Sequence, residues 1–231
     1  MNLHGLIVSC QAPADSPLHE PSIIAAMAVA SLNRGATAVR IDTPSHIAAV
    51  RSQTDRPIIG LWKRQFPNCE VYITPQFEQA AALARAGADW IAIDATLRPR
   101  PDGEELDTLI ARIQQELGKP VFADVDTLDS AIAAANAGAD CLATTLYGYT
   151  AQTQDCTPPG YDLLQELRQK FHCPIICEGG ISSPQMAEKA LNLGANAVVV
   201  GTDITGIDRK VKTYQQFLSV SKSVRYPGES C

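Results

Sequence analysis

Short apolar runs alternate along the chain with segments whose apolar residues recur every three or four positions. The runs lack the polar alternation of half-exposed strands, a pattern typical of parallel strands that helices cover on the outside. The first run covers residues 6–9, and the helical spacing is clearest in residues 75–87, 128–138 and 184–194. The pattern therefore predicts repeated strand–helix units around a parallel sheet.

Four of the units share a sequence repeat, in which a Gly-Ala step leads directly into an apolar run: "RGATAVRI", "AGADWIAID", "AGADCLATT" and "LGANAVVVG". Their glycines recur every 51 to 56 residues, at Gly35, Gly87, Gly138 and Gly194. Glycine in this place predicts a helix that ends in a left-handed cap, followed by a buried strand. Three interleaved runs, "RPIIGLW", "KPVFADV" and "CPIICEGG", begin with a proline, which is tolerated at the first residue of a strand.

Together with residues 6–9, these segments predict eight strands. Eight units in a chain of this length correspond to about 29 residues each, the size of a βα repeat. We therefore expect a single (β/α)8 TIM barrel over residues 1–231, with a doubly wound open sheet as the alternative. The repeat at roughly two-unit spacing favours the barrel, because a closed barrel has approximate internal symmetry.

Composition narrows the function classes. The chain is 45% hydrophobic and 19% charged, as is usual for a globular protein, and its net charge of −6 without a basic cluster argues against nucleic-acid binding. The longest apolar run is far too short for a membrane helix, and the N-terminus lacks the basic start and long apolar stretch of a signal peptide. Seven cysteines without a CxxC pair indicate a reduced, cytoplasmic protein rather than a disulfide framework or a zinc site.

Polar residues follow most of the apolar runs, and in a TIM barrel the active site lies at the carboxyl ends of the strands. The predicted strand ends, in order, are Gln11, Arg40, Lys63, Asp94, Asp124, Thr144 with Thr145, Glu178 and Gly201. Alternate strands contribute to one layer of a barrel, so we expect the four side chains of the odd-numbered strands to lie together: Gln11, Lys63, Asp124 and Glu178.

A charge just past a strand is commonly a solvated loop residue, and Asp42 or Asp94 could serve only to cap a helix or anchor a loop. Five polar strand ends after such apolar runs nevertheless favour a site. Arg40 is the sharpest anomaly, because it places a permanent cation within the apolar segment "TAVRID".

Glycine-rich turns follow the seventh and eighth predicted strands, as "EGGIS" (178–182) and "GTDIT" (201–205). At these two places TIM barrels frequently bind phosphate, because exposed backbone N–H groups point at the anion and glycine allows close approach. We therefore expect a phosphorylated ligand held by Gly179, Gly180, Gly201 and Thr202.

The motifs together resemble the N-acetylmannosamine-6-phosphate 2-epimerase family. The similarity runs through "GLIVSCQ", "AVRI", "PIIGLWKR", "VYITP", "ADWIAIDAT", "TTLYGYT", "EGGIS" and "VVVGTDIT". It implies interconversion of N-acetylmannosamine 6-phosphate and N-acetylglucosamine 6-phosphate in amino-sugar or sialic-acid catabolism, with a small phosphosugar as partner and without a metal or organic cofactor. Barrels of this kind are commonly homodimers, but the sequence leaves the oligomeric state open.

By motif, the resemblance makes Lys63 of "WKR" the catalytic base and Glu178 of "EGG" its partner carboxylate. Gln11, Arg40, Asp124 and Tyr149 match substrate-contacting positions.

One segment departs from the family pattern. Members often carry Ala-Ile-Thr-Arg-Pro after the eighth strand, where the arginine can meet the phosphate, whereas this chain reads "DITGIDRK". Gly206 takes the place of that arginine, and Asp203 adds a negative charge. Either Arg209 or Lys210 substitutes, or the backbone holds the phosphate.

Epimerisation at C2 requires a base that removes a proton from the carbon next to the aldehyde of the open-chain sugar and returns it to the other face. A lysine can do so only if its pKa is lowered, which burial at the end of an apolar strand and a nearby Arg40 would achieve. Arg64 is excluded, because a guanidinium does not deprotonate. Our hypothesis gives Glu178 the protons at C1 and the ring oxygen, Arg40 the oxyanion, and Gln11 and Asp124 the orientation of hydroxyl or acetamido groups.

Two other functions stay open at this point. Lys63 could form a Schiff base with the same aldehyde, as in an aldolase or a thiazole-synthase-like enzyme. The barrel could instead bind phosphosugars without turnover. A metal-dependent pentose-phosphate epimerase is poorly supported, because none of the four histidines falls at a suitable strand end.

Overall fold

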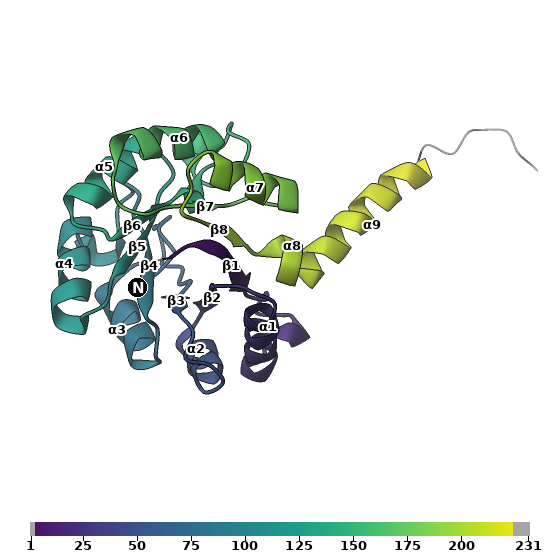
Figure 1. The fold of residues 1–231 in the computed structure, drawn as a ribbon, viewed down its shortest axis with the longest axis horizontal. Coiled ribbons are helices and arrows are strands. Elements are labelled where there is room, and N and C mark those ends of the chain that lie inside the picture. Colours follow the sequence, from purple (N-terminus) through teal and green to yellow (C-terminus); the bar gives the residue numbers. More distant parts are fainter. Residues whose placement is uncertain (1–2, 224–231) are drawn as a thin grey trace, which may run out of the picture.

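The computed structural model describes residues 3–223. Eight parallel strands form a closed barrel in chain order, with helices around it (Figure 1). The strands are β1 (Gly5–Cys10), β2 (Ala38–Asp42), β3 (Ile58–Leu61), β4 (Trp90–Asp94), β5 (Val121–Asp124), β6 (Cys141–Ala143), β7 (Ile175–Glu178) and β8 (Ala197–Val200). The predicted TIM barrel is confirmed, and the open-sheet alternative is wrong because β8 pairs with β1.

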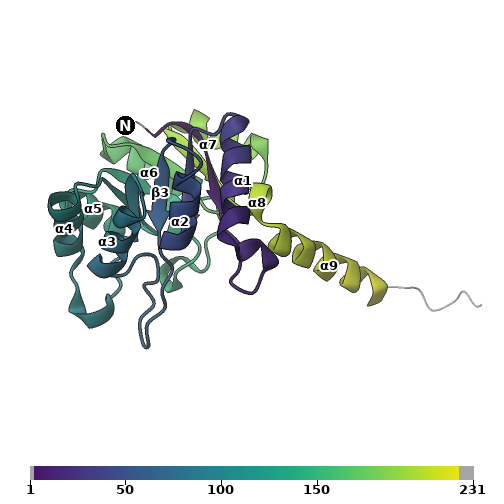
Figure 2. The ribbon, with the colours of Figure 1, turned by 90° about the horizontal axis from the view of Figure 1, so that it is seen from below.

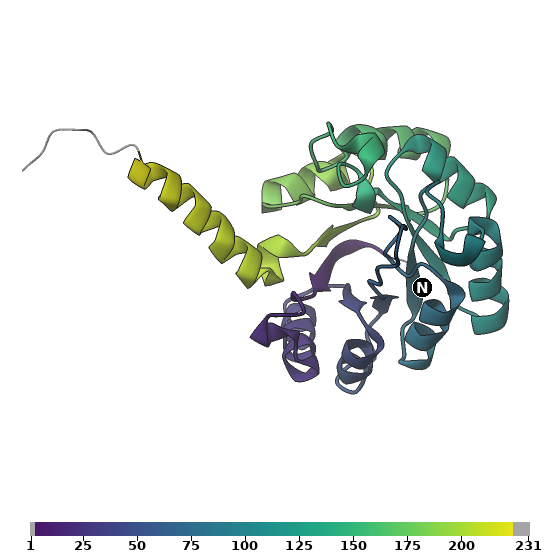
Figure 3. The same ribbon diagram turned by 180° about the vertical axis from the view of Figure 1, so that it is seen from behind.

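Helices follow the strands and cover the outside of the barrel, as the view from behind in Figure 3 also shows. They are α1 (Pro21–Asn33), α2 (Pro44–Arg51), α3 (Phe77–Arg85), α4 (Leu106–Leu117), α5 (Leu128–Asn136), α6 (Tyr161–Lys170), α7 (Pro184–Asn192), α8 (Thr202–Thr205) and α9 (Ile207–Ser223). Four short 3₁₀ turns lie in three loops: η1 (Pro17–His19) after β1, η2 (Pro101–Gly103) after β4, and both η3 (Thr144–Leu146) and η4 (Ala151–Thr153) after β6. The three predicted helical segments thus contain α3, α5 and α7.

The repeated glycines end helices as the sequence predicts. All four have φ between +94° and +104°, which glycine adopts without the steric cost that a Cβ would bring. At Gly87 a Cβ would also lie 2.9 Å from the Cγ atom of Arg51. Each glycine therefore turns the chain at once from a helix into the next strand.

Two apolar layers stabilise the barrel. The outer layer packs the strands against the helices, and the inner layer fills the barrel with side chains such as Ile7, Ile59, Phe122 and Ile176. These interior side chains are fully buried, which is the usual way a barrel of this size is closed to water. Side chains therefore fill the barrel, and no channel runs through it from the open end.

The structure corrects two predicted strand ends: β3 ends at Leu61, before Lys63, and β2 ends later than predicted. β2 does not stop at Arg40 but continues to Asp42, because Ile41 and Asp42 still pair with Gly60 and Leu61 of β3. Arg40 consequently lies inside the barrel with only 1% of its surface exposed. Its guanidinium stacks over the ring of Phe122, 4.9 Å from the ring centre.

Helix α9 differs from the others because it runs outward from the barrel, as Figures 1 and 2 show. It carries large exposed apolar side chains, among them Ile207, Val211, Tyr214 and Leu218. None of the described helices is long and apolar enough to cross a membrane. The extent of the domain over residues 1–231 stays a prediction, because residues 1–2 and 224–231 lie outside the described part.

Candidate active site

The predicted catalytic lysine stands at the open end of the barrel, two residues past β3. It forms an isolated antiparallel bridge with Ile73. On either side of this bridge, Thr74 N donates to Trp62 O at 2.9 Å and Arg64 N donates to Tyr72 O at 2.9 Å. The chain beyond β3 therefore folds back on itself as a small hairpin, which fixes Lys63 at the mouth.

The surroundings of the Lys63 ammonium favour its neutral form. Its side chain faces the open mouth, where Nζ donates to Oε1 of Gln11 at 2.5 Å. The pKa of Lys63 is lowered, first because the surrounding strand ends reduce the contact of the ammonium with water, although the residue stays exposed at the mouth, and then because Arg40 and Arg209 repel its charge. Asp42 and Glu178 act in the opposite direction without reversing the shift. The predicted lowering of this pKa, with Arg40 contributing, agrees with the structure.

Arg40 holds two of the other predicted residues. Its Nη1 and Nη2 atoms donate to both carboxylate oxygens of Asp124 at 2.9 and 2.6 Å. Nη1 also donates to Oε2 of Glu178 at 2.7 Å. The three side chains are 2%, 0% and 13% exposed, so they form a buried triad just below the mouth.

Threonines of η3, at the end of β6, complete this triad. The hydroxyl of Thr145 lies 2.6 Å from Asp124 Oδ1 and 3.2 Å from Glu178 Oε2. Thr144 Oγ1 donates to the carbonyl of Glu178 at 3.0 Å. The sequence placed both threonines at a strand end, but it assigned neither a role. Their hydroxyls fix the position of Glu178 within the triad.

The charge state of Glu178 is set by competing effects. Burial raises the pKa of Glu178 to about 7, with a contribution from Asp124, although Arg40, Thr145 and Lys63 pull it down. Burial alone would lower the pKa of Arg40, but Asp124 and Glu178 raise it above its usual value, so the guanidinium stays charged. The mouth thus combines a fixed cation with a carboxyl group that can gain or lose a proton near neutral pH.

Asp94 anchors a loop, one of the two alternatives that the sequence left open. It is fully buried and accepts from the Thr96 hydroxyl at 2.7 Å and from Nη2 of Arg98 at 2.7 Å. Its main-chain carbonyl accepts from Arg100. Burial raises the pKa of Asp94 despite these partners. The residue stiffens the loop after β4.

The sequence did not point to Tyr72, which lies in the hairpin that carries Lys63. This half-buried side chain packs against the inner core. Its pKa is raised by loss of water and by the charges of Asp124 and Asp94, whereas Arg40 and Arg98 act against the shift. Tyr72 is therefore close enough to the triad for the charges of Asp124 and Arg40 to act on its hydroxyl group. Tyr72 belongs to no predicted strand end, and the sequence signal for it is the motif "VYITP" that the chain shares with the family it resembles.

The two glycines after β7 have the geometry expected of an anion site. Gly179 and Gly180 have φ of +98° and +72°, and within residues 3–223 no acceptor receives the N–H of either one. A Cβ at Gly180 would lie 2.6 Å from Pro158, so only glycine fits there. The exposed ring of Tyr149 covers Gly179, with Cε2 3.3 Å from where a Cβ would be.

The residues after β8 explain the departure from the family pattern. Gly201 precedes α8, which begins at Thr202. Asp203 forms an ion pair with Lys210, which neutralises the negative charge that Asp203 brings. Arg209 is exposed and has no carboxylate partner within the described residues. Its positive charge contributes to lowering the pKa of Lys63. Of the two cations considered for the missing arginine, Lys210 is thus occupied and Arg209 is available.

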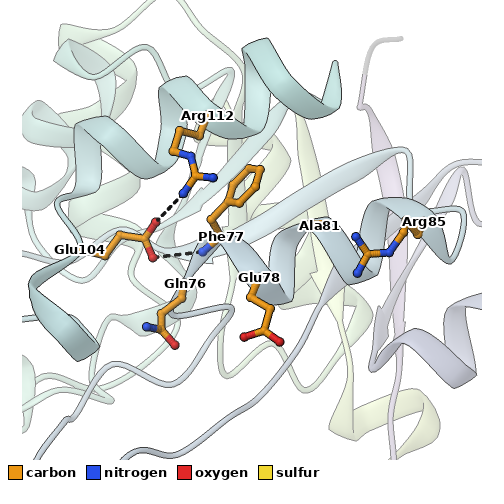
Figure 4. A pocket seen from close by; sticks show the side chains of 7 residues that line it. All are labelled: Gln76, Phe77, Glu78, Ala81, Arg85, Glu104 and Arg112. Atoms are coloured by element: carbon orange, nitrogen blue, oxygen red, sulfur yellow. Dashed lines mark hydrogen bonds and ion pairs between the residues drawn. The ribbon is translucent and has the colours of Figure 1, made fainter.

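A separate hollow of about 380 Å³ lies outside the barrel, between α3 and the segment leading into α4 (Figure 4). Its charged side chains already serve structural contacts. Arg112 stacks on Phe77 at 3.6 Å and pairs with Glu116 at 2.7 Å, while Glu104 accepts from the Phe77 N–H at 3.1 Å. The hollow lies between α3 and α4, apart from the barrel mouth.

No group of three His, Cys, Asp or Glu residues that could hold a metal occurs in the described part of the chain.

Comparisons with known proteins agree on one family. The family model described as "Putative N-acetylmannosamine-6-phosphate epimerase" matches residues 24–220. A relative from Synechococcus elongatus, named "Putative N-acetylmannosamine-6-phosphate 2-epimerase", is 62% identical over 212 residues, or 91% of each chain. A relative of the same name from Clostridium perfringens is 40% identical over 213 residues, 92% of this chain and 96% of its own.

Solved structures give the same result. The N-acetylmannosamine-6-phosphate 2-epimerase from Clostridium perfringens superimposes with a TM-score of 0.88 at 38% identity, over 92% of this chain and 93% of that chain. A thiamine phosphate pyrophosphorylase from Pyrococcus furiosus matches with a TM-score of 0.58 at 15% identity, over 96% and 97% of the two chains. The second likeness supports the barrel fold alone.

Proposed function

The chain belongs to the N-acetylmannosamine-6-phosphate epimerase family, and we propose that it interconverts N-acetylmannosamine 6-phosphate and N-acetylglucosamine 6-phosphate in amino-sugar or sialic-acid catabolism. The observation that carries this proposal is the pairing, at one barrel mouth, of a lysine with a lowered pKa and a carboxyl group whose pKa is raised to about 7. The Glu178 carboxyl group can gain or lose a proton near neutral pH, and the lowered pKa of Lys63 makes its neutral, basic form more accessible. An epimerisation through an enolate requires such proton transfers. A cytoplasmic location, which the cysteine pattern predicts, is part of the same proposal.

In the proposed reaction, Lys63 removes the C2 proton of the open-chain sugar and returns it to the opposite face. The amine is oriented by its hydrogen bond to Gln11. Gln11 is itself held by Ser9, whose Oγ accepts from Nε2 at 2.9 Å. A base that is fixed on a rigid strand end can reach C2 without reorganisation, which lowers the barrier to proton transfer.

Glu178 is proposed to move the proton between the C1 and ring oxygens during ring opening. Arg40 already donates to both carboxylates, so we propose that it stabilises the enolate through its buried positive charge rather than by direct donation alone. Asp124 keeps this guanidinium in place, and we propose that through it Asp124 helps to orient the sugar.

The phosphate is proposed to lie over the glycines that follow β7 and β8. The unpaired N–H groups of Gly179 and Gly180 support this placement, and Gly201 and Thr202 offer the first N–H groups of the chain after β8. Arg209 supplies the cation that the family pattern otherwise places at position 206. Tyr149 closes this side of the site by covering Gly179.

Changing Arg209 to alanine tests the phosphate assignment. A charge-assisted hydrogen bond is worth roughly 1.5–3 kcal/mol, so we expect the KM for the phosphosugar to rise roughly 10-fold or more, with a smaller change in kcat. The matched control is Lys212→Ala on the same helix, which should leave KM unchanged. Steady-state kinetics of both variants decide the matter, and an unaltered KM in Arg209→Ala would mean that the backbone alone holds the phosphate.

We further propose that the enzyme is a homodimer in which α9 contacts a second copy. Ile207, Val211, Tyr214 and Leu218 recur at helical spacing along one face of α9 and are 55–70% exposed. Such a row of large apolar side chains on one protomer costs free energy unless another surface covers it. The homodimer expected for barrels of this kind would supply that surface.

Introducing charge into this face should separate the protomers. We expect Val211→Glu combined with Leu218→Glu to halve the molar mass measured by light scattering during size-exclusion chromatography. Gln216→Glu adds a negative charge to the opposite face and should leave the mass unchanged. A wild-type protein with the mass of a single chain at micromolar concentration would refute the dimer.

Proton NMR in deuterated water tests the catalytic proposal directly. Wild-type enzyme incubated with N-acetylmannosamine 6-phosphate should produce N-acetylglucosamine 6-phosphate and replace the C2 proton by deuterium. Binding of the sugar without either change would indicate a phosphosugar-binding barrel that lacks turnover.

A further inference from the structure

Asp42 occupies a special place beside Lys63. It is the last residue of β2, where its Cα pairs with that of Leu61 in β3. Its Oδ1 accepts the main-chain N–H of Lys63 at 3.0 Å. Beyond the end of β3, the Lys63 N–H therefore donates to a side-chain carboxylate instead of to a main-chain carbonyl of the neighbouring strand. This bond holds the chain where Lys63 enters the mouth.

The backbone around Asp42 is tightly held. Its carbonyl lies 3.1 Å from Nδ1 of His46, whose Nε2 lies 2.8 Å from the carbonyl of His19. The next residue, Thr43, has φ +70°, which is rare for a β-branched residue and persists only where the surrounding structure enforces it. Thr43 N also donates to Leu61 O at 2.9 Å. These contacts fix the direction in which the Asp42 carboxylate points.

The charges that face Lys63 come from three elements. β2 contributes Arg40 and Asp42, β7 contributes Glu178, and α9 contributes Arg209, while Gln11 after β1 is neutral. Glu178 is already paired with Arg40. Asp42 has no ion-pair partner among residues 3–223, so its negative charge is not offset by a contacting cation.

We propose that Asp42 is a positioning residue, which holds Lys63 at the barrel mouth through its main-chain N–H and supplies the unpaired negative charge that this lysine needs to carry the C2 proton between the two faces of the sugar. The inference deepens the proposed function and rests on the role of Lys63 in it. Asp42 acts through Lys63 and is not assigned any contact with the substrate.

The balance of charges gives the reason for such a residue. Loss of water and two arginines lower the pKa of Lys63, and Asp42 is the largest influence that opposes them. A base with too low a pKa is mostly deprotonated but accepts a proton weakly, so a general base works best when its pKa lies near the operating pH. Without Asp42, Lys63 would be a weaker base, and its side chain would also be held less firmly where it removes and returns the C2 proton.

Two substitutions separate the two parts of this role. Asp42→Asn keeps an oxygen that can accept the Lys63 N–H but removes the charge, whereas Asp42→Ala removes both. Loss of a nearby negative charge favours the neutral amine, so the limb of the pH profile of kcat/KM that Lys63 controls should move to lower pH by roughly one unit in both variants. A second limb set by Glu178 should stay in place, because Asp42 does not contact the triad.

The kcat at the plateau should distinguish the variants further. We expect a fall of a few-fold in Asp42→Asn, because the base is weaker, and roughly a further 10-fold fall in Asp42→Ala, because the lysine also loses its backbone anchor. Asp55→Asn removes an exposed carboxylate elsewhere and serves as control, with an unchanged profile. Circular dichroism confirms that each variant is folded, and Asp42→Asn alone decides the question of charge if Asp42→Ala does not fold.

A profile of Asp42→Asn that superimposes on wild type would overturn the electrostatic part of the proposal. Equal kcat values for the two variants would overturn the anchoring part. Failure of the proposed function is distinguishable from both, because in that case the wild-type enzyme itself would show no C2 exchange in deuterated water at any pH.

Discussion

Replacing Lys63 by alanine is expected to remove exchange of the C2 proton while leaving the barrel folded. The side chain lies at the mouth, outside both apolar layers, so its loss creates no cavity in the core. General-base catalysis contributes roughly 10²–10⁴-fold to a rate, and we expect a loss at the upper end of this range because Lys63 is the only base that the proposal assigns to C2. Proton NMR in deuterated water measures epimerisation and exchange together.

Arg64→Ala is the matched control for this experiment. Arg64 follows Lys63 in the same hairpin, but its guanidinium lies 5.1 Å from the ring centre of Trp62 and cannot act as a base. We expect its activity to stay within about threefold of wild type, since surface cations contribute little. Normal C2 exchange in Lys63→Ala would remove the lysine from the mechanism. Trapping of a substrate–lysine adduct by borohydride in the wild-type enzyme would instead show Schiff-base chemistry.

The position of this lysine could be predicted because strand ends are easy to recognise in an all-parallel barrel. Each strand is a continuous apolar run, and its first polar residue marks the mouth, as at Gln11, Lys63, Asp124 and Glu178. The Gly-Ala repeat, the three runs that begin with proline and the N-terminal run together predicted eight units, and the spacing of the repeat favoured a closed barrel. These are local signals, which depend on burial and on backbone conformation rather than on distant contacts.

The partners of these residues could not be predicted in the same way. Arg40 was expected near Lys63 and the oxyanion, but the extension of β2 to Asp42 places it deeper, under Asp124 and Glu178. Which carboxylates an arginine meets depends on the register of strands that are 84 to 138 residues apart in sequence. No periodicity in the chain carries that information.

The contacts of loop residues also could not be predicted from the sequence. Tyr72 reaches the mouth only because residues 62–64 pair with residues 72–74. The negative charge of Asp203 seemed to oppose a phosphate, but in the structure Asp203 of α8 forms an ion pair with Lys210 of α9. In both cases the contact joins two segments of the chain, and the sequence pattern of neither segment indicates that they meet.

Replacing Arg40 by methionine is expected to destabilise the protein strongly as well as inactivate it. Methionine is of similar length and can fill the space over Phe122, so the main effect is electrostatic. Asp124 and Glu178 would remain buried without their cation, and removing one partner of a buried ion pair costs about 3–5 kcal/mol. Glu116→Gln, which breaks an exposed pair with Arg112, is the control and should change the unfolding midpoint far less.

The destabilisation by Arg40→Met should depend on pH in a defined direction. The pKa of Glu178 is already raised from 4.5 to about 7 in the folded protein, and loss of Arg40 raises it further, because Arg40 lowers it now. A carboxyl group whose pKa is higher in the folded state binds more protons there than in the unfolded chain, so stability falls as pH rises through this window. Urea unfolding should therefore show a larger loss at pH 8 than at pH 5.

A charge-free triad provides the last control for this prediction. Combining Arg40→Met with Asp124→Asn and Glu178→Gln removes the unpaired carboxylates, and replacing a complete buried ion cluster by neutral groups is often close to neutral for stability. We expect the triple variant to regain most of the lost free energy of unfolding and to lose the pH dependence, while remaining inactive. If Arg40→Met were destabilised equally at both pH values, the arginine would support the barrel by packing over Phe122, and the electrostatic account of the triad would fail.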